Sequence, residues 1–283
     1  MKIFILIFTL LFTLNAKSLF SNDDQADSSV YIGSLKDLVI ATQKTRGLTN
    51  SYLNGNTSAM LLVYSNRKDM KRAIGIMESL PLAADPIINT RASAISSSLI
   101  KLNNKAFRRD APEVFSDYTE QIAQILMLAQ TISKRSSKDL NPFGQEASLI
   151  MMETMLPMTE YVGQLRGFGS GLAAKGKVSK SELEKIYVLV NEVKTLNVQL
   201  QSQMHQLTST HSDKIARNIN AEIATANTNA NAYTSFAQSK FAEKKVTIDP
   251  NSYFDNGTKL ISSIIKAYNT INEAILEDSK GWI

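Results

Sequence analysis

Apolar residues recur along most of this chain at intervals of three and four, the spacing of one face of an α-helix. Strand-like alternation of apolar and polar residues is scarce. The pattern predicts about eight antiparallel helices, of which the fifth follows the Asn141–Gly144 break and ends near Ala174. The other seven have the approximate bounds Tyr31–Leu53, Ser58–Leu80, Pro86–Phe107, Ala111–Ser133, Ser179–Leu207, Ser212–Ala242 and Pro250–Asp278. We therefore expect an all-α protein.

The breaks between these helices suggest two halves. Asn141–Gly144, a Pro-Gly break, separates four helices from four longer ones, so we expect two stacked four-helix bundles at about 30–135 and 143–278. Ser179 and Glu182 have the spacing of a capping box at the start of a helix. A weak internal echo supports the division, because an Arg-Gly pair lies late in the first helix of each half, at Arg46-Gly47 and Arg166-Gly167.

The first 18 residues have the parts of a secretory signal peptide. Lys2 is followed by an apolar run from Ile3 to Leu14 and then by small residues at Ala16 and Ser18. The run is shorter than the roughly 20 apolar residues of a membrane-spanning helix. We expect cleavage and a periplasmic or secreted protein; an uncleaved N-terminal anchor is the alternative.

Composition narrows the classes of function. There is no cysteine, so a disulfide framework and a thiolate site are excluded. The net charge is +5, but no block of basic residues is interleaved with aromatic ones, which argues against nucleic acid as a partner. His205 and His211 lie six apart and do not share a helical face as a metal pair would, and no catalytic motif is present. We therefore expect that the protein is not an enzyme and that it binds no metal or cofactor. We interpret the methionines at 151, 152 and 155 as residues that pack in the core.

Arginines occur where the helical pattern calls for buried apolar residues. Arg46, Arg67 and Arg91 each lie in the apolar stripe of one of the first three helices. These stripes are Leu35-Val39-Thr42-Arg46-Thr49-Leu53, Met60-Val63-Arg67-Met70-Ile74-Met77 and Ile87-Arg91-Ile95-Ser98-Leu102. A buried cation requires an anion, and none of these stripes contains an acidic residue.

Two explanations of the buried arginines stay open. The planar fork of a guanidinium matches a planar oxyanion such as nitrate or nitrite, so converging arginines would form a pocket for one. Alternatively, the arginines pair with a carboxylate from another helix or extend to the edge of the bundle. The candidate carboxylates are Asp117, Glu120, Glu153 and Glu160.

Several short segments resemble the nitrate- and nitrite-sensing (NIT) family, helical sensor modules of bacterial chemoreceptors, kinases and an antitermination regulator. Gln43-Lys-Thr-Arg46-Gly47-Leu48 is similar to its opening Glu-Arg-Gly-Leu motif. The other similar segments are Asn66-Arg67-Lys68-Asp69, the run around Arg91, Tyr118-Thr119-x-x-Ile122, Gly163-Gln164-Leu165-Arg166-Gly167 and Ser179-x-x-Glu182-Leu183. The likeness covers about 38–185. The chain departs from the family at the residue before each Arg-Gly, where glutamate is replaced by Thr45 and Leu165.

The resemblance implies two four-helix bundles and arginines that bind nitrate or nitrite between helices. Carried over residue by residue, Arg46 and Arg166 are the first ligand-binding candidates, and Arg67 and Arg91 support them. No kinase, methyl-accepting or RNA-binding module is present in the sequence, so we expect a membrane receptor or transporter to read the liganded state. A homodimer is also considered.

Two functions therefore compete. The first is a sensor in which an anion draws arginine-bearing helices together. The second is a scaffold or interaction protein of the same fold whose arginines are paired internally. A carboxylate in the fork of Arg46 or Arg166 would favour the second.

Overall fold

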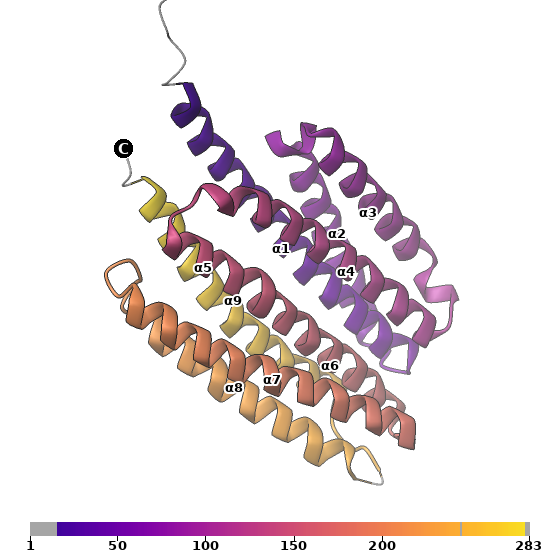
Figure 1. Ribbon diagram of the computed structural model, residues 1–283. Coiled ribbons are helices and arrows are strands. Elements are labelled where there is room, and N and C mark those ends of the chain that lie inside the picture. Colours follow the sequence, from indigo (N-terminus) through magenta and orange to yellow (C-terminus); the bar gives the residue numbers. More distant parts are fainter. Residues whose placement is uncertain (1–15, 244, 281–283) are drawn as a thin grey trace, which may run out of the picture.

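The computed structural model describes residues 16–243 and 245–280, with side chains from residue 25 onward, and every element in these ranges is helical (Figure 1). Of the predicted signal peptide, residues 1–15 lie outside the described part, and residues 16–18 are the first residues of α1. The α-helices are α1 (Ala16–Leu53), α2 (Ala59–Ser79), α3 (Pro86–Lys105), α4 (Ala111–Ser136), α5 (Pro142–Ile150), α6 (Leu156–Lys175), α7 (Lys180–Thr210), α8 (Ile219–Phe241) and α9 (Pro250–Lys280).

The helices form two groups that lie side by side. In the first group, α1 packs against α2 and α4, and α3 packs against α4. In the second group, α6 packs against α7 and α9, and α8 packs against the same two helices. The groups meet along α1 and α6, which run through the middle of the molecule in Figure 1. The two predicted four-helix bundles are therefore present, with their long sides in contact.

Local sequence explains where four of the helices begin. Pro86, Pro142 and Pro250 lie in the first turn of their helices, where a missing N–H breaks no hydrogen bond. The Asp85 side chain accepts hydrogen bonds from two backbone amides of α3. The predicted capping box at Ser179 and Glu182 is formed at the start of α7.

The predicted fifth helix is divided by a π-helical turn. Met151–Met155 (η4) joins α5 to α6, and Pro157 follows in the first turn of α6. Proline inside a regular α-helix would leave one carbonyl without its donor, and the wider turn just before Pro157 changes the hydrogen-bond register at that point. The three methionines of this turn are buried, as the interpretation of them as core packing predicted.

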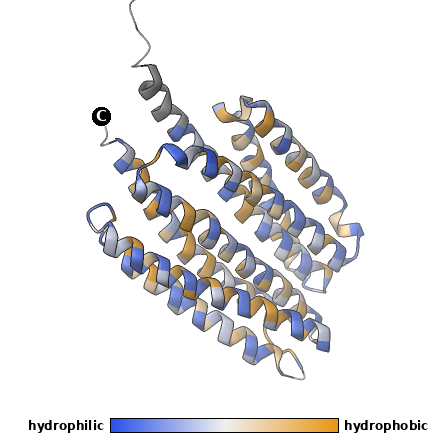
Figure 2. Ribbon diagram, in the orientation of Figure 1, coloured by the Kyte–Doolittle hydropathy of each residue, from blue (hydrophilic) through white to orange (hydrophobic). Residues whose placement is uncertain are grey.

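Each helix carries hydrophobic and hydrophilic residues together along its length (Figure 2). The predicted stripes of α1 and α2 point inward: Leu35, Val39, Thr42, Arg46 and Thr49 are buried, as are Val63, Met70, Ile74 and Met77. The predicted stripe of α3 is correct at Ile95 and Leu102 and wrong at Ile87, Arg91 and Ser98. The buried face of α3 is Ile88, Ala92, Ile95, Ser96, Leu99 and Leu102. Within the described ranges, no helix is long and apolar enough to cross a bilayer.

Candidate functional site

The two Arg-Gly pairs of the sequence meet where α1 crosses α6. A Cβ atom added to Gly47 would lie 3.0 Å from the Cα of Gly167, and one added to Gly167 would lie 2.9 Å from the Cα of Gly47. Only glycine permits so close an approach of two helix backbones. Along the crossing, Gln43 lies against Gly163 and Asn50 lies against Gly171, so the two helices run in the same direction.

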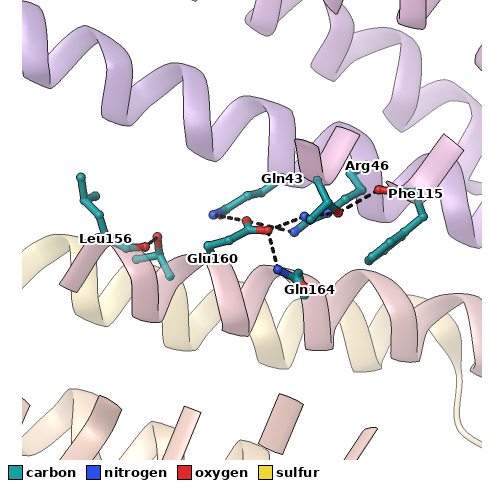
Figure 3. Close-up of polar contacts among 8 residues, drawn as sticks. Gln43, Arg46, Phe115, Leu156, Glu160 and Gln164 are labelled. Carbon is teal, nitrogen blue, oxygen red and sulfur yellow. Dashed lines mark hydrogen bonds and ion pairs between the residues drawn. The ribbon is translucent and has the colours of Figure 1, made fainter. Parts of the chain in front are cut away.

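Arg46 is fully buried and is paired with a carboxylate (Figure 3). Its Nη1 lies 2.5 Å from Oε1 of Glu160 and its Nη2 lies 3.2 Å from Oε2. Gln43 and Gln164 each donate a further hydrogen bond to this carboxylate, at 3.0 and 2.9 Å. The Nη1–Nη2 edge of Arg46 is thus occupied by a planar anion that the chain itself supplies, whereas its Nε is buried without a hydrogen-bond partner. The alternative that named Glu160 as an internal partner is correct for this arginine.

Arg166 is also buried, with 1% of its surface exposed, but its environment differs. Its Nη1 donates to the Thr258 hydroxyl at 2.9 Å, whereas its Nε and Nη2 are buried without a hydrogen-bond partner. Among the described residues, no carboxylate is ion-paired with it. Burial lowers the pKa of Arg166 to about 10 from 12.5, and smaller contributions come from the nearby Tyr233, Arg46, Glu160 and Asp255. A pKa lowered by burial indicates a cation that its surroundings do not fully compensate.

The surroundings of the two arginines share an aromatic ring and a threonine hydroxyl. The Arg46 guanidinium lies over the ring of Phe115 at 4.9 Å, and its Nη1 donates to the hydroxyl of Thr119 at 2.9 Å. The Arg166 guanidinium lies over the ring of Phe254 at 4.4 Å, beside the Thr258 hydroxyl already described. Each ring also contacts a glycine of the opposite Arg-Gly pair. The site therefore has an approximate two-fold axis that exchanges α1 with α6 and α4 with α9.

Arg67 lies apart from this crossing. It is half-buried on α2, and its guanidinium lies over the rings of Phe107 and Tyr64 at 4.2 and 5.9 Å. Its Nε and Nη2 have no hydrogen-bond partner. Its charge influences Tyr118, whose pKa burial raises to about 12. Arg67 thus lies on the predicted stripe of α2 against two aromatic rings, away from the crossing beside which Arg46 and Arg166 lie.

Arg91 does not join the predicted site. It is exposed, because the buried face of α3 passes through Ala92 instead. Its Nη1 lies 3.5 Å from the Thr131 hydroxyl, and it lines a surface groove of about 740 Å³ together with Lys134 and Glu153. The expectation that four arginines converge is therefore wrong for Arg91. The structure brings together only Arg46 and Arg166.

The C-terminal half of the site was missed at the level of sequence. Phe254 and Thr258 belong to α9, and the likeness used above ended near residue 185. A repeated pattern was available as a signal, because Phe115-Ser-Asp-Tyr-Thr119 and Phe254-Asp-Asn-Gly-Thr258 share the spacing Phe-x-x-x-Thr. Lys185 was missed too. Its ammonium lies over Phe168 at 4.6 Å and Phe115 at 5.4 Å, and its pKa is lowered by desolvation and by the charge of Arg46.

Comparison with known proteins agrees with this architecture. The structure of the NasR transcription antiterminator is similar to the chain with a TM-score of 0.65 and 14% sequence identity, over 93% of this chain and 71% of that one. At this identity the likeness shows the fold alone. No curated protein sequence matches the chain significantly. The sequence pattern described as nitrate and nitrite sensing (NIT) matches residues 37–279, which include both arginine environments. The chain therefore belongs to the nitrate- and nitrite-sensing family.

Proposed function

We propose that this protein is a sensor that binds nitrate or nitrite where its two bundles meet, with Arg166 as the residue that receives the anion. The observation that carries the proposal is the unoccupied fork of Arg166. Nε and Nη2 are the two nitrogens on the side of a guanidinium away from Cδ, and both are buried and unpartnered here. Their N–H groups are parallel, which suits two oxygens of one planar oxyanion.

Energetics favours an anion at this position. A pKa of about 10 in place of 12.5 corresponds to a cost of about 3 kcal/mol for keeping Arg166 charged in the folded protein. An anion in the fork would offset that cost. The surrounding charges point the same way, because Arg46, Arg166 and Lys185 are opposed within the cluster chiefly by Glu160.

The position of the fork offers a way to signal. Arg166 belongs to α6 and Thr258 to α9, while α1 touches α6 at Gly47 and Gly167. Such a signal needs two arrangements of the bundles, one tighter than the other at this contact. An anion can shift the balance between them only to the extent that it binds them with different affinity. We propose that a membrane receptor or transporter reads this change. We further propose that the apolar N-terminal run directs the protein to the periplasm, which N-terminal sequencing of the protein from that compartment would test.

The pairing of Arg46 with Glu160 supports a second candidate function. If both arginines served only to hold α1 against α6, the protein would be a helical scaffold that binds no small ligand. The two candidates differ at Arg166, because a scaffold has no use for a buried cation without a counter-charge.

Thermal unfolding with added sodium nitrate or nitrite separates the two. With ligand at about 100 times its dissociation constant, the sensor should gain about 2.7 kcal/mol, a rise in Tm of roughly 5 °C for a chain of this size. Chloride and sulfate serve as controls for ionic strength. The rise should be absent in Arg166→Met and retained in Arg91→Met, which changes an exposed arginine. A folded wild-type protein with no rise specific to nitrate or nitrite would favour the scaffold.

A further inference from the structure

The approximate two-fold axis of the site does not extend to the carboxylate that pairs with Arg46 or to the amides that bond it. Gln43 corresponds to Gly163, and Gln164 corresponds to Lys44. Glu160 lies six positions before Arg166 on α6 and reaches across to Arg46 on α1. The position six before Arg46 on α1 is Ile40, which packs against the hydrophobic core. The axis that relates Arg46 to Arg166 therefore relates Glu160 to an apolar residue.

We propose that Arg46 and Arg166 each belong to one of two related anion sites. Glu160 is a built-in anion that occupies the site at Arg46, so the site at Arg166 is the one that accepts the ligand. This inference rests on the proposed function, because it takes the ligand to be a small planar oxyanion. It adds that Glu160 sets the number of anions bound per chain.

The contacts of Glu160 are those expected of a bound oxyanion. Its two oxygens face two nitrogens of Arg46, and side-chain amides of Gln43 and Gln164 complete the set of donors. A carboxylate and nitrate share a planar group with two oxygens at similar separation, so one guanidinium fork accepts either. Because the carboxylate is tethered, it competes with free anions at a high effective concentration. Free nitrate is thereby excluded from Arg46.

The contacts across the axis predict where a second built-in anion would lie. Arg46 pairs with Glu160 across parallel helices, and the equivalent pair is Arg166 with position 40. The same exchange accounts for the observed contacts of Gly47 with Phe254 and of Gly167 with Phe115. A carboxylate at position 40 should therefore reach the Nη1–Nη2 edge of Arg166, which shares Nη2 with the edge proposed for nitrate.

The first test counts bound anions. Isothermal titration of sodium nitrate, at ionic strength held constant with chloride, should give one site in the wild-type chain and two in Glu160→Gln, which removes the charge and keeps the shape. Glu153→Gln changes an exposed glutamate of the adjoining turn and should leave one site. One site in both the wild type and a folded Glu160→Gln protein would overturn the inference and leave the proposed function standing. No binding in the wild type together with one site in Glu160→Gln would show that Glu160 blocks Arg46, but it would reject Arg166 as the ligand site and with it the second anion site. No binding by either protein would reject both the inference and the proposed function.

A second, reciprocal variant tests the inference even if the Glu160→Gln protein does not fold. Ile40→Glu supplies a carboxylate to Arg166 and should weaken nitrate binding at least 100-fold, whereas the equally large but neutral Ile40→Gln should retain the single site. Unchanged binding by folded Ile40→Glu would overturn the two-fold relation on which the inference depends.

Discussion

At the scale of single residues, the two buried arginines have opposite energetic roles. Arg46 is held by a carboxylate, a threonine hydroxyl and an aromatic ring, whereas Arg166 has only a hydroxyl and a ring. Removing one member of a buried ion pair leaves the other uncompensated. Removing a buried cation that has no counter-charge instead relieves the free-energy cost of keeping that charge away from water.

We therefore expect Arg46→Met and Arg166→Met to differ in stability when no nitrate is present. Arg46→Met leaves Glu160 buried without its cation and should lower the free energy of unfolding by about 3–5 kcal/mol. Arg166→Met should change it by less than about 1 kcal/mol, because lost packing and the lost bond to Thr258 are offset by removal of the buried charge. Urea unfolding in chloride buffer measures both values. Equal losses in the two variants would show that Arg166 is compensated in the folded protein.

The lowered pKa of Arg166 predicts how anion binding depends on pH. The guanidinium is charged below pH 10 and loses its proton above it, so an anion must restore that proton to bind at higher pH. Nitrate affinity should stay constant near pH 8 and fall about tenfold for each pH unit well above 10. The neighbouring Arg46, Glu160, Asp255 and Tyr233 shift the midpoint but not the direction. Titrations between pH 8 and 11 test this, and affinity that does not fall would mean that another cation binds the anion.

Sequence patterns identified the buried arginine of α1 but did not identify the residue that pairs with it. The stripe of α1 placed Arg46 in the core, but Glu160 lies 114 positions away and could be named only as one of four candidates. For α3, Ile95 and Leu102 belong to both the predicted and the observed buried face. Hydrophobic spacing alone did not choose between faces one residue apart, and Arg91 was therefore misplaced.

At the scale of helices, prolines and caps made most boundaries predictable. α1 begins earlier than predicted because the polar segment before Tyr31 contains no proline or glycine and continues the helix. The π-helical turn before Pro157 was not predicted, because its cause is a local backbone adjustment that leaves the apolar pattern unbroken.

The contact of α1 with α6 predicts which glycine is sensitive to substitution. In Gly167→Ala, the new methyl group would lie 2.9 Å from the Cα of Gly47, so the helices must separate at a cost of about 1–3 kcal/mol. Gly75→Ala is the matched control, because nothing lies within 4 Å of its added carbon, and it should stabilise the protein by about 0.5–1 kcal/mol. Thermal unfolding compares the two, and a neutral Gly167→Ala would be inconsistent with backbone contact at this crossing.

At the scale of the whole molecule, the weak echo between the two Arg-Gly pairs corresponds to a real two-fold relation. The sequence indicated two bundles, but not that the repeated segments touch, because no pattern within one helix encodes which helix it will cross. Arg46 bridges the two bundles, through Thr119 of α4 and Glu160 of α6. Arg166 contacts Phe254 and Thr258 of its own bundle, directly beside the crossing at Gly167.

This arrangement predicts where a ligand should change protein dynamics. Nitrate should slow amide hydrogen exchange mainly in the parts of α1, α6 and α9 around Gly47, Gly167 and Thr258, because an anion at Arg166 restrains the opening of this junction. The outer helix α3 should be unaffected. Protection confined to the groove beside Arg91 would instead assign the anion to that surface.

The central claim is that Arg166 is the anion receptor while Glu160 occupies Arg46. A crystal structure of the wild-type protein grown in nitrate tests it most directly. The account predicts a planar ion with two oxygens on Nε and Nη2 of Arg166, and Glu160 still in the fork of Arg46. A nitrate ion on Arg46 with Glu160 displaced, or crystals with nitrate present and an empty Arg166 fork, would contradict it.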